Sequence, residues 1–265
     1  METVDKAGKS YWDSCWAGSE IPNAINPDEN YINRQFHHHF TKAFAGIQTQ
    51  GATLLEIGCA RSQWLPYFAQ QFGFKVYGLD YSALGCRQAQ LILEKAGVDG
   101  SVVCADIFTP PSAMLDKFDV VISFGVAEHF ENTAICIGAF ARFLKPGGVL
   151  VTNIPNMTGL IGLTQRLLNR PIFDIHVPLG TYELANAHAQ VDLKDIHCEY
   201  LVPLCFGVSN LNGLDPTDMR TRVKDGVLHN LSRLSQVIWW IDDHGMTIPI
   251  NQLSGSFVLC VARKQ

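Results

Sequence analysis

The chain has 265 residues, of which 47% are hydrophobic and 17% are charged, so it can bury a substantial core. Its formal net charge is −5 and its Lys and Arg residues form no cluster, which argues against a nucleic-acid-binding protein. No apolar run is long enough to span a bilayer, and the opening METVDKAGKS lacks a signal-peptide core, so we expect a cytoplasmic protein without membrane association.

Residues 1–50 are rich in aromatic and histidine side chains and are predicted to form a partly helical cap. Trp12 and Trp16 lie four positions apart and therefore share one face of a helix, next to Tyr11. This aromatic face either packs against the rest of the domain or closes over a bound ligand.

Three consecutive histidines, His37, His38 and His39, lie in the same segment. On a helix, successive side chains point about 100° apart, so three in a row cannot converge on one ion. We therefore expect no metal site.

Between residues 51 and 155, apolar runs alternate with helical segments. The predicted strands are TLLEIG, KVYGLD, SVVCAD, FDVVISF and GVLVTNIPN, and the predicted helices span residues 63–72, 82–97 and 133–144. Continuous apolar strands that alternate with helices indicate a parallel sheet covered on both faces. We predict a doubly wound α/β fold whose ligand binds at the carboxyl ends of the strands.

A long segment, residues 156–255, separates this core from a last predicted strand at residues 256–265. We expect this segment and the N-terminal cap to cover the strand ends, within a single domain spanning residues 1–265. Residues 158–173 are amphipathic but carry only two basic side chains, which favours packing in the core over binding to a membrane surface. Trp239 and Trp240 line either a pocket or the contact of a possible homodimer.

The eight cysteines are scattered and include no Cys-x-x-Cys pair. Cys59, Cys104 and Cys260 lie within or beside apolar stretches. We expect the cysteines to be reduced thiols rather than disulfides.

Acidic and small residues follow the predicted strands, where a ligand is expected. Gly58 would let a ligand approach the backbone closely. Asp80 could accept hydrogen bonds from the two hydroxyls of a ribose. Asp106 could accept one from an exocyclic amine such as that of adenine, and Ile107 and Phe124 could enclose a flat base.

The glycine fingerprint of dinucleotide-binding folds is incomplete, because Ala60 and Ser62 follow Gly58. A pyrophosphate must approach the helix N-terminus closely, and the glycines permit that approach. S-adenosylmethionine has no phosphate, and the two small residues leave room for its amino-acid part. A nicotinamide-dependent reductase, the competing enzyme, would predict Gly at position 60 or 63, where the chain has Ala and Gln.

Five segments resemble, in order, the motifs of class I S-adenosylmethionine-dependent methyltransferases: EIGCARS, YGLDYS, CADIF, FDVVISFGVAEHF and LKPGGVLVTNIPN. The resemblance covers roughly residues 50–155, and the last strand is similar to the family's antiparallel seventh strand. AEHF and IPN resemble the ubiquinone-biosynthesis O-methyltransferases and related small-molecule enzymes. The resemblance implies a Rossmann-like sheet of seven strands, with a helical N-terminal cap and an insertion before the last strand.

The resemblance also implies the residues of the cofactor site. The Gly58, Asp80 and Phe124 positions contact the cofactor in the similar small-molecule enzymes, and the Glu56 and Asp106 positions do so across the wider family. We assign cofactor contacts to Glu56, Gly58, Cys59, Ala60, Asp80, Tyr81, Asp106, Ile107 and Phe124. Arg34 is a further candidate, because a guanidinium can bind a carboxylate through two hydrogen bonds.

Methyltransferases of this kind commonly close over the substrate with their N-terminal segment. We assign substrate contacts to Tyr11, Trp12, Trp16 and Asn156. His129, beside Glu128, is a candidate general base, although a structural histidine packed against the next helix is the favoured interpretation. His176 is a second candidate base, because relatives often place a substrate-facing histidine near there.

The sequence therefore predicts S-adenosylmethionine-dependent methyl transfer to a small-molecule acceptor, on oxygen or nitrogen and with carbon also possible. Such a transfer is an in-line displacement, in which holding the reactants in place can supply about 7–11 kcal/mol. The alternative from another class is a non-catalytic protein of the same fold that binds the cofactor.

Overall fold

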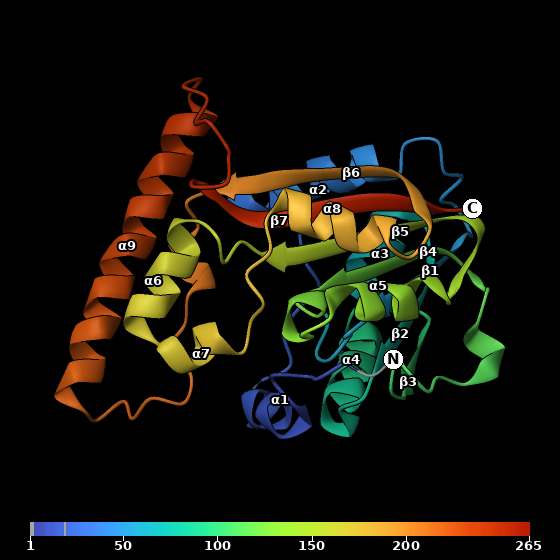
Figure 1. The fold of residues 1–265 in the computed structure, drawn as a ribbon, viewed down its shortest axis with the longest axis horizontal. Helices are drawn as coiled ribbons and strands as arrows, with labels where there is room; N and C mark the ends of the chain where they lie inside the picture. Colours follow the sequence, from blue (N-terminus) through green and yellow to red (C-terminus); the bar gives the residue numbers. More distant parts are fainter. Residues whose placement is uncertain (1–2, 19) are drawn as a thin grey trace.

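The computed structural model of the protein describes residues 3–18 and 20–265 (Figure 1). Within these residues, seven strands form one sheet in the order β3-β2-β1-β4-β5-β7-β6. The strands are β1 Thr53–Ile57, β2 Lys75–Asp80, β3 Gly100–Cys104, β4 Phe118–Phe124, β5 Leu144–Pro155, β6 Leu193–Pro203 and β7 Gly255–Lys264. The first five run parallel, and β7 pairs antiparallel with both β5 and β6. The predicted doubly wound α/β sheet is confirmed.

Helices cover both faces of this sheet. They are α1 Lys9–Trp16, α2 Tyr31–Ala43, α3 Trp64–Phe72, α4 Ala83–Lys95, α5 Thr133–Ala141, α6 Leu160–Leu168, α7 Arg170–Asp174, α8 Thr181–Ala189 and α9 Met219–Asp243, with short 3₁₀ turns η1 Ser112–Met114, η2 Ala127–His129 and η3 Phe206–Val208. In β4, Val121 faces the core under α5 and α8, whereas Val120 and Ile122 face the core under α2, α3 and α4. This alternation arises because successive strand side chains point to opposite faces.

Helix α4 begins where the sequence predicted, because Ser82 caps it. The Ser82 hydroxyl oxygen accepts a hydrogen bond from the Gly85 amide at 3.0 Å, which satisfies one of the free N–H groups of the first turn. Helix α9 lies at one end of the molecule (Figure 1). No helix in the described part of the chain is both long and apolar enough to cross a membrane.

The segment between β5 and β7 contributes a strand as well as cap helices. Strand β6 forms the edge of the sheet beside β7, and its register shifts between Lys194 and His197. Asp195 lies at this irregularity with a φ of 51°. Charged residues and bulges are common on edge strands, and they hide the apolar pattern that identified the central strands.

The expectation that all cysteines are reduced is wrong for two of them. Cys198 of β6 and Cys260 of β7 form a disulfide, with their Cα atoms 4.1 Å apart. The two strands place these residues directly opposite each other. Their sequence separation of 62 residues gave no indication of this pairing. The free cysteines in the described chain are Cys15, Cys59, Cys86, Cys104, Cys136 and Cys205.

Candidate active site

A cavity of about 540 Å³ opens at the carboxyl ends of β1, β2 and β4, where the doubly wound fold predicts a ligand. Its wall includes nine residues of the predicted sites: Glu56, Gly58, Ala60, Asp80, Tyr81, Asp106, Ile107, Phe124 and His129. Trp12 and Trp16 of α1 also line it. The cavity therefore joins the strand ends to the N-terminal cap.

The turn after β1 is organised by Ser62. Its hydroxyl donates to Glu56 Oε2 at 2.6 Å and accepts from the backbone amide of Trp64 at 3.0 Å, at the start of α3. Burial raises the pKa of Glu56 to about 8, so this carboxyl is protonated at neutral pH. Gly58 has a φ of 75°, and a Cβ there would lie 2.3 Å from a methyl carbon of Val126. Gly58 thus permits both the turn and the close approach of the loop after β4.

Asp80 links the turns that follow β1 and β2. Its Oδ1 accepts from the Ser82 amide at 2.7 Å, and its Oδ2 accepts from the Ala60 amide at 3.0 Å. Burial raises the pKa of Asp80, while these amide bonds oppose the rise. Each carboxylate oxygen can accept a second hydrogen bond, so the group can still receive one from a ligand.

The wall near β3 combines an exposed acid with apolar groups. Asp106 is exposed, and its Oδ1 accepts from the Phe108 amide at 2.8 Å. Ile107 is buried beside it. Tyr81 and Asp5 also line the cavity, and the Tyr81 hydroxyl donates to Asp5 at 2.9 Å, which ties the N-terminal segment to the end of β2.

Helix α1 covers part of the cavity. Trp12 stacks on Trp16 with ring centroids 5.8 Å apart and meets the ring of His129 edge-on at 5.2 Å. The Gln88 side chain of α4 donates to the Trp16 carbonyl at 2.9 Å and fixes the end of α1. Tyr11 belongs to the same helix but does not line the cavity. The predicted aromatic cap is therefore present, with two of its three aromatic residues at the cavity.

Two other predicted site residues lie away from the cavity. Arg34 of α2 forms an ion pair with Asp243 at the end of α9. Asn156 is fully buried, and its side-chain amide donates to the carbonyls of Gln252 at 2.7 Å and Gly255 at 2.8 Å. Neither Arg34 nor Asn156 lines the cavity in which we expect the cofactor and the substrate to bind.

Cys59 and Phe124 pack against other parts of the protein to a greater extent than we expected. Cys59 is fully buried and does not line the cavity. Phe124 lines the cavity, but its ring stacks on Trp64 with centroids 5.0 Å apart and an angle of 10°. Because Trp64 occupies one face of this ring, a flat base could meet only its other face or its edge.

Sequence reasoning missed several cavity residues, of which Arg61 is the most informative. Arg61 follows the turn after β1 and has a φ of 55°. One end of its guanidinium donates to the Glu20 carbonyl, whereas its Nε is buried and has no hydrogen-bond partner among the described residues. Arg61 could have been predicted from its position in EIGCARS, because the other residues of that turn were already expected to line the cavity.

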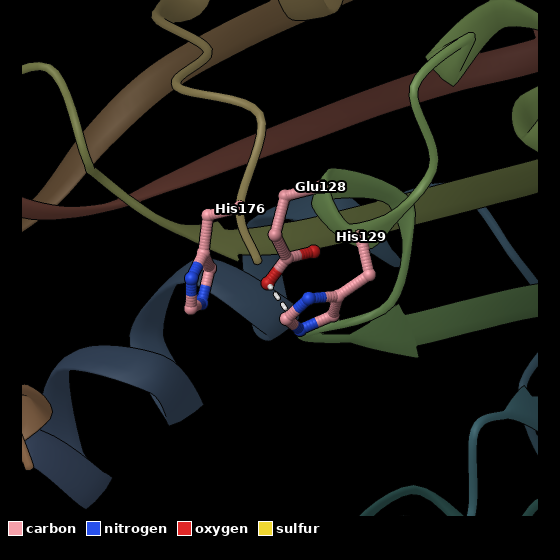
Figure 2. Close-up of side chains that lie close together, drawn as sticks. All are labelled: Glu128, His129 and His176. Carbon is pink, nitrogen blue, oxygen red and sulfur yellow. Dashed lines mark ion pairs between the residues drawn. The ribbon is translucent and has the colours of Figure 1, made fainter. Parts of the chain in front are cut away.

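A cluster of three polar side chains lies beside this cavity (Figure 2). Glu128 and His129 belong to η2 and the adjoining loop supplies His176. Glu128 Oε1 lies 3.9 Å from His129 Nε2, and the two imidazole centroids are 4.6 Å apart. Among residues 3–18 and 20–265, this is the one group of three potential metal ligands whose ligand atoms all lie within 4.8 Å of one another. The sequence did not predict it, because His176 is distant along the chain.

Burial governs the charge of this cluster. It lowers the pKa of His129 and lowers the pKa of His176 to about 4, and it raises the pKa of Glu128 to about 8. At neutral pH the imidazoles are therefore neutral and the carboxyl is protonated. Lys6 binds close by, since its ammonium donates to the His176 carbonyl at 3.0 Å.

Comparison with known proteins places the chain among methyltransferases. A family model described as a methyltransferase domain matches residues 29–197. The ubiquinone biosynthesis O-methyltransferase of Nitrobacter winogradskyi is 26% identical over 159 residues, which span 59% of each chain. The matched part is therefore less than two thirds of that relative.

Solved structures share the fold at low sequence identity. A putative sarcosine dimethylglycine methyltransferase from Galdieria sulphuraria gives a TM-score of 0.59 at 14% identity, over 99% of each chain. Phosphoethanolamine N-methyltransferase 2 of Haemonchus contortus, solved with phosphomonomethylethanolamine and S-adenosylhomocysteine, gives 0.59 at 16% identity, over 98% of this chain and 58% of that one.

Proposed function

Because this chain belongs to the class I S-adenosylmethionine-dependent methyltransferases, we propose that it transfers a methyl group from S-adenosylmethionine to a small-molecule acceptor. The observation that carries the proposal is the cavity at the strand ends. It brings together an acid at or just beyond the carboxyl end of each of β1, β2 and β3 and the neutral imidazole of His129, under an aromatic helix.

The residues of the cavity fit this cofactor. Asp80 has acceptor capacity left for ribose hydroxyls, and Asp106 with Ile107 is suited to adenine. The unpartnered Nε of Arg61 can donate to the carboxylate of the amino-acid part, which is the role that we first assigned to Arg34. Glu56 would face the positively charged part of the ligand. When bound, S-adenosylmethionine supplies a methyl group already activated by its sulfonium.

The acceptor is proposed to be a small, partly apolar molecule methylated on oxygen. The name of the curated relative, an O-methyltransferase, supports oxygen over nitrogen and carbon. Trp12, Trp16 and Phe130 give the cavity an apolar wall, and His129 is the polar group among them. Holding the acceptor there and excluding water are the main tasks of the protein, because the methyl group needs no further activation. The net charge of −5 gives no reason to propose a nucleic-acid acceptor.

We also propose that the protein is a homodimer that pairs through α9. Apolar residues lie along its exposed side at intervals of three, four or seven positions: Met219, Val223, Val227, Leu234, Val237 and Trp240. Arg233, Gln236, Val237 and Trp240 line a shallow hollow on this side. Arg, Trp and apolar residues are typical of interface centres.

Calorimetric titration tests the cofactor assignment. S-adenosylmethionine and S-adenosylhomocysteine should bind and NADPH should not. Asp80→Asn should weaken binding of both sulfur cofactors roughly tenfold to a hundredfold, because it removes a charged acceptor. Asp116→Asn, at an exposed position far from the cavity, is the control and should leave affinity unchanged. Unchanged affinity in Asp80→Asn would reject the ribose contact, and no binding of either sulfur cofactor would reject the function.

An acceptor screen tests the chemistry. Transfer of label from methyl-labelled S-adenosylmethionine should be found with phenols, enols or alcohols. Transfer to amines or carbon acids alone would reject O-methylation. Tight cofactor binding without transfer to any class would support the non-catalytic alternative.

A further inference from the structure

The cluster of Glu128, His129 and His176 has the composition and orientation of a metal site. We propose that these three side chains bind one Zn²⁺ ion beside the cavity and leave a coordination position for an oxygen of the acceptor. Two imidazoles and one carboxylate form a known type of catalytic zinc site, in which the fourth ligand is water or substrate. The suggested use of the ion rests on the proposed function, whereas its binding can be tested without it.

Both imidazoles are already oriented by the backbone. His129 Nδ1 lies 3.0 Å from the Ile175 carbonyl oxygen, and His176 Nδ1 lies 2.7 Å from the Ile172 carbonyl oxygen. A carbonyl only accepts, so each Nδ1 carries the proton and each Nε2 keeps a free electron pair. Metal-binding histidines are oriented in the same way, by donating their second N–H to a carbonyl or carboxylate.

The Glu128 carboxyl group is the second observation that points to a ligand. Its side chain is 1% exposed, and neither of its oxygens has a hydrogen-bond partner among the described residues. Leaving such a group unpaired costs roughly 1–3 kcal/mol or more. The 3.9 Å between Glu128 Oε1 and His129 Nε2 is too long for a hydrogen bond. It is close to the roughly 3.3 Å that separates two ligand atoms on a tetrahedral zinc ion at about 2 Å.

The buried histidine His188 has a structural role in the same fold and serves as a comparison for His129 and His176. His188 also has its Nδ1 bonded to a backbone carbonyl, that of Leu184 at 2.8 Å. Its Nε2 is bonded as well, to the Thr152 hydroxyl at 3.1 Å. Both nitrogens of His188 are therefore used, whereas Nε2 of His129 faces a carboxyl group at a distance that an ion would bridge.

The place of the cluster suggests what the ion would do. His129 lines the cavity, and Trp12 covers its edge. An ion held there would bind the acceptor's hydroxyl oxygen and lower the pKa of that hydroxyl, as zinc does for bound water. The proton would pass to water, and the oxygen would keep the electron pair with which it attacks the methyl group. A separate general base is then unnecessary.

The test titrates Zn²⁺ into protein that has been treated with a chelator. Wild type should bind one equivalent that His176→Gln does not bind, and Co²⁺ in its place should give the absorption of a tetrahedral site only in wild type. The loss of Zn²⁺ affinity in His176→Gln should be larger than the roughly tenfold to hundredfold loss that follows when a group that only hydrogen-bonds to a metal ligand is removed. His188→Gln, at the structural histidine, is the matched control and should retain the ion. An ion held by an exposed histidine such as His38 would not respond to His176→Gln.

Binding of S-adenosylhomocysteine is measured on the same samples. His176 does not line the cofactor cavity, so His176→Gln should still bind this ligand, which also shows that it is folded. If that variant does not fold, Glu128→Gln provides the same comparison with nearly unchanged volume. Equal Zn²⁺ affinity in wild type and variant, or no binding in wild type, would overturn the metal site. Loss of cofactor binding in wild type would overturn the proposed function instead.

Discussion

Glu56 is a carboxyl group whose charge depends on what occupies the cavity. Burial raises its pKa to about 8, so it holds a proton at pH 7, even though the Ser62 hydroxyl donates to it. S-adenosylmethionine carries one net positive charge, from its sulfonium, ammonium and carboxylate. A positive charge near an acid lowers its pKa. Cofactor binding should therefore shift Glu56 towards its ionised form.

The expected result is that cofactor binding releases protons at pH 7, by up to about one per site. Calorimetric titration in buffers of different ionisation enthalpy measures this number directly. Glu56→Gln should release fewer protons, because it removes this carboxyl group. Equal proton release from wild type and Glu56→Gln would contradict the assignment.

For individual residues, the sequence predicted those at the strand ends that line the cavity better than those whose partners lie far away along the chain. The position of Asp80 at the cavity could be predicted because it ends a parallel strand, and the carboxyl ends of such strands form the ligand-binding edge of the sheet. Arg34 and Asn156 could not, because their partners, Asp243 and the carbonyls near Gly255, lie in the long segment before β7. Local pattern does not specify how such a segment returns to the sheet. The grouping of His176 with His129 escaped prediction for the same reason.

Strands β6 and β7 are joined both by their hydrogen bonds and by the disulfide of Cys198 and Cys260. A crosslink that closes a loop of this length restricts the unfolded chain by about 4 kcal/mol. Reduction should lower the free energy of unfolding in urea by up to that amount. Cys198→Ser should unfold like reduced wild type, and Cys205→Ser, at a buried free cysteine, should still respond to the reductant.

Thiol counting provides an independent check on the same bond. Denatured, unreduced protein should react at six cysteines, the number that are free in the structure. Reaction at all eight, or an unchanged stability after reduction, would show that the disulfide does not form. Eight reduced cysteines would be the pattern expected of a protein in a reducing compartment.

At the scale of elements, the central strands could be predicted and the edge could not. Strands β1 and β4 are continuous apolar runs because helices cover both of their faces. Strand β6 has one neighbour, charged residues and an irregular register, so its sequence resembles a loop. Its role in the sheet depends on β7, which follows it by about fifty residues of cap.

Helix α9 is a long helix at one end of the whole molecule (Figure 1). Several of its apolar side chains are exposed. If two copies pair through it, sedimentation should show a dimer that dissociates on dilution. Val237→Lys should shift the protein to monomer, because a buried lysine would need a partner that the helix does not offer there. Leu91→Lys, at an exposed apolar position on α4, should not. A monomer at every concentration would exclude this pairing.

The order of the strands has a consequence for how the molecule is made. Strand β7 lies between β5 and β6, although β6 precedes it in the chain. A nascent chain on the ribosome therefore carries β6 with no strand to pair with until residues 255–264 have left the exit tunnel. During that interval the edge of β5 is open and Cys198 has no partner. Unpaired strand edges can pair with other chains, so the incomplete protein is exposed to aggregation at this stage of its synthesis.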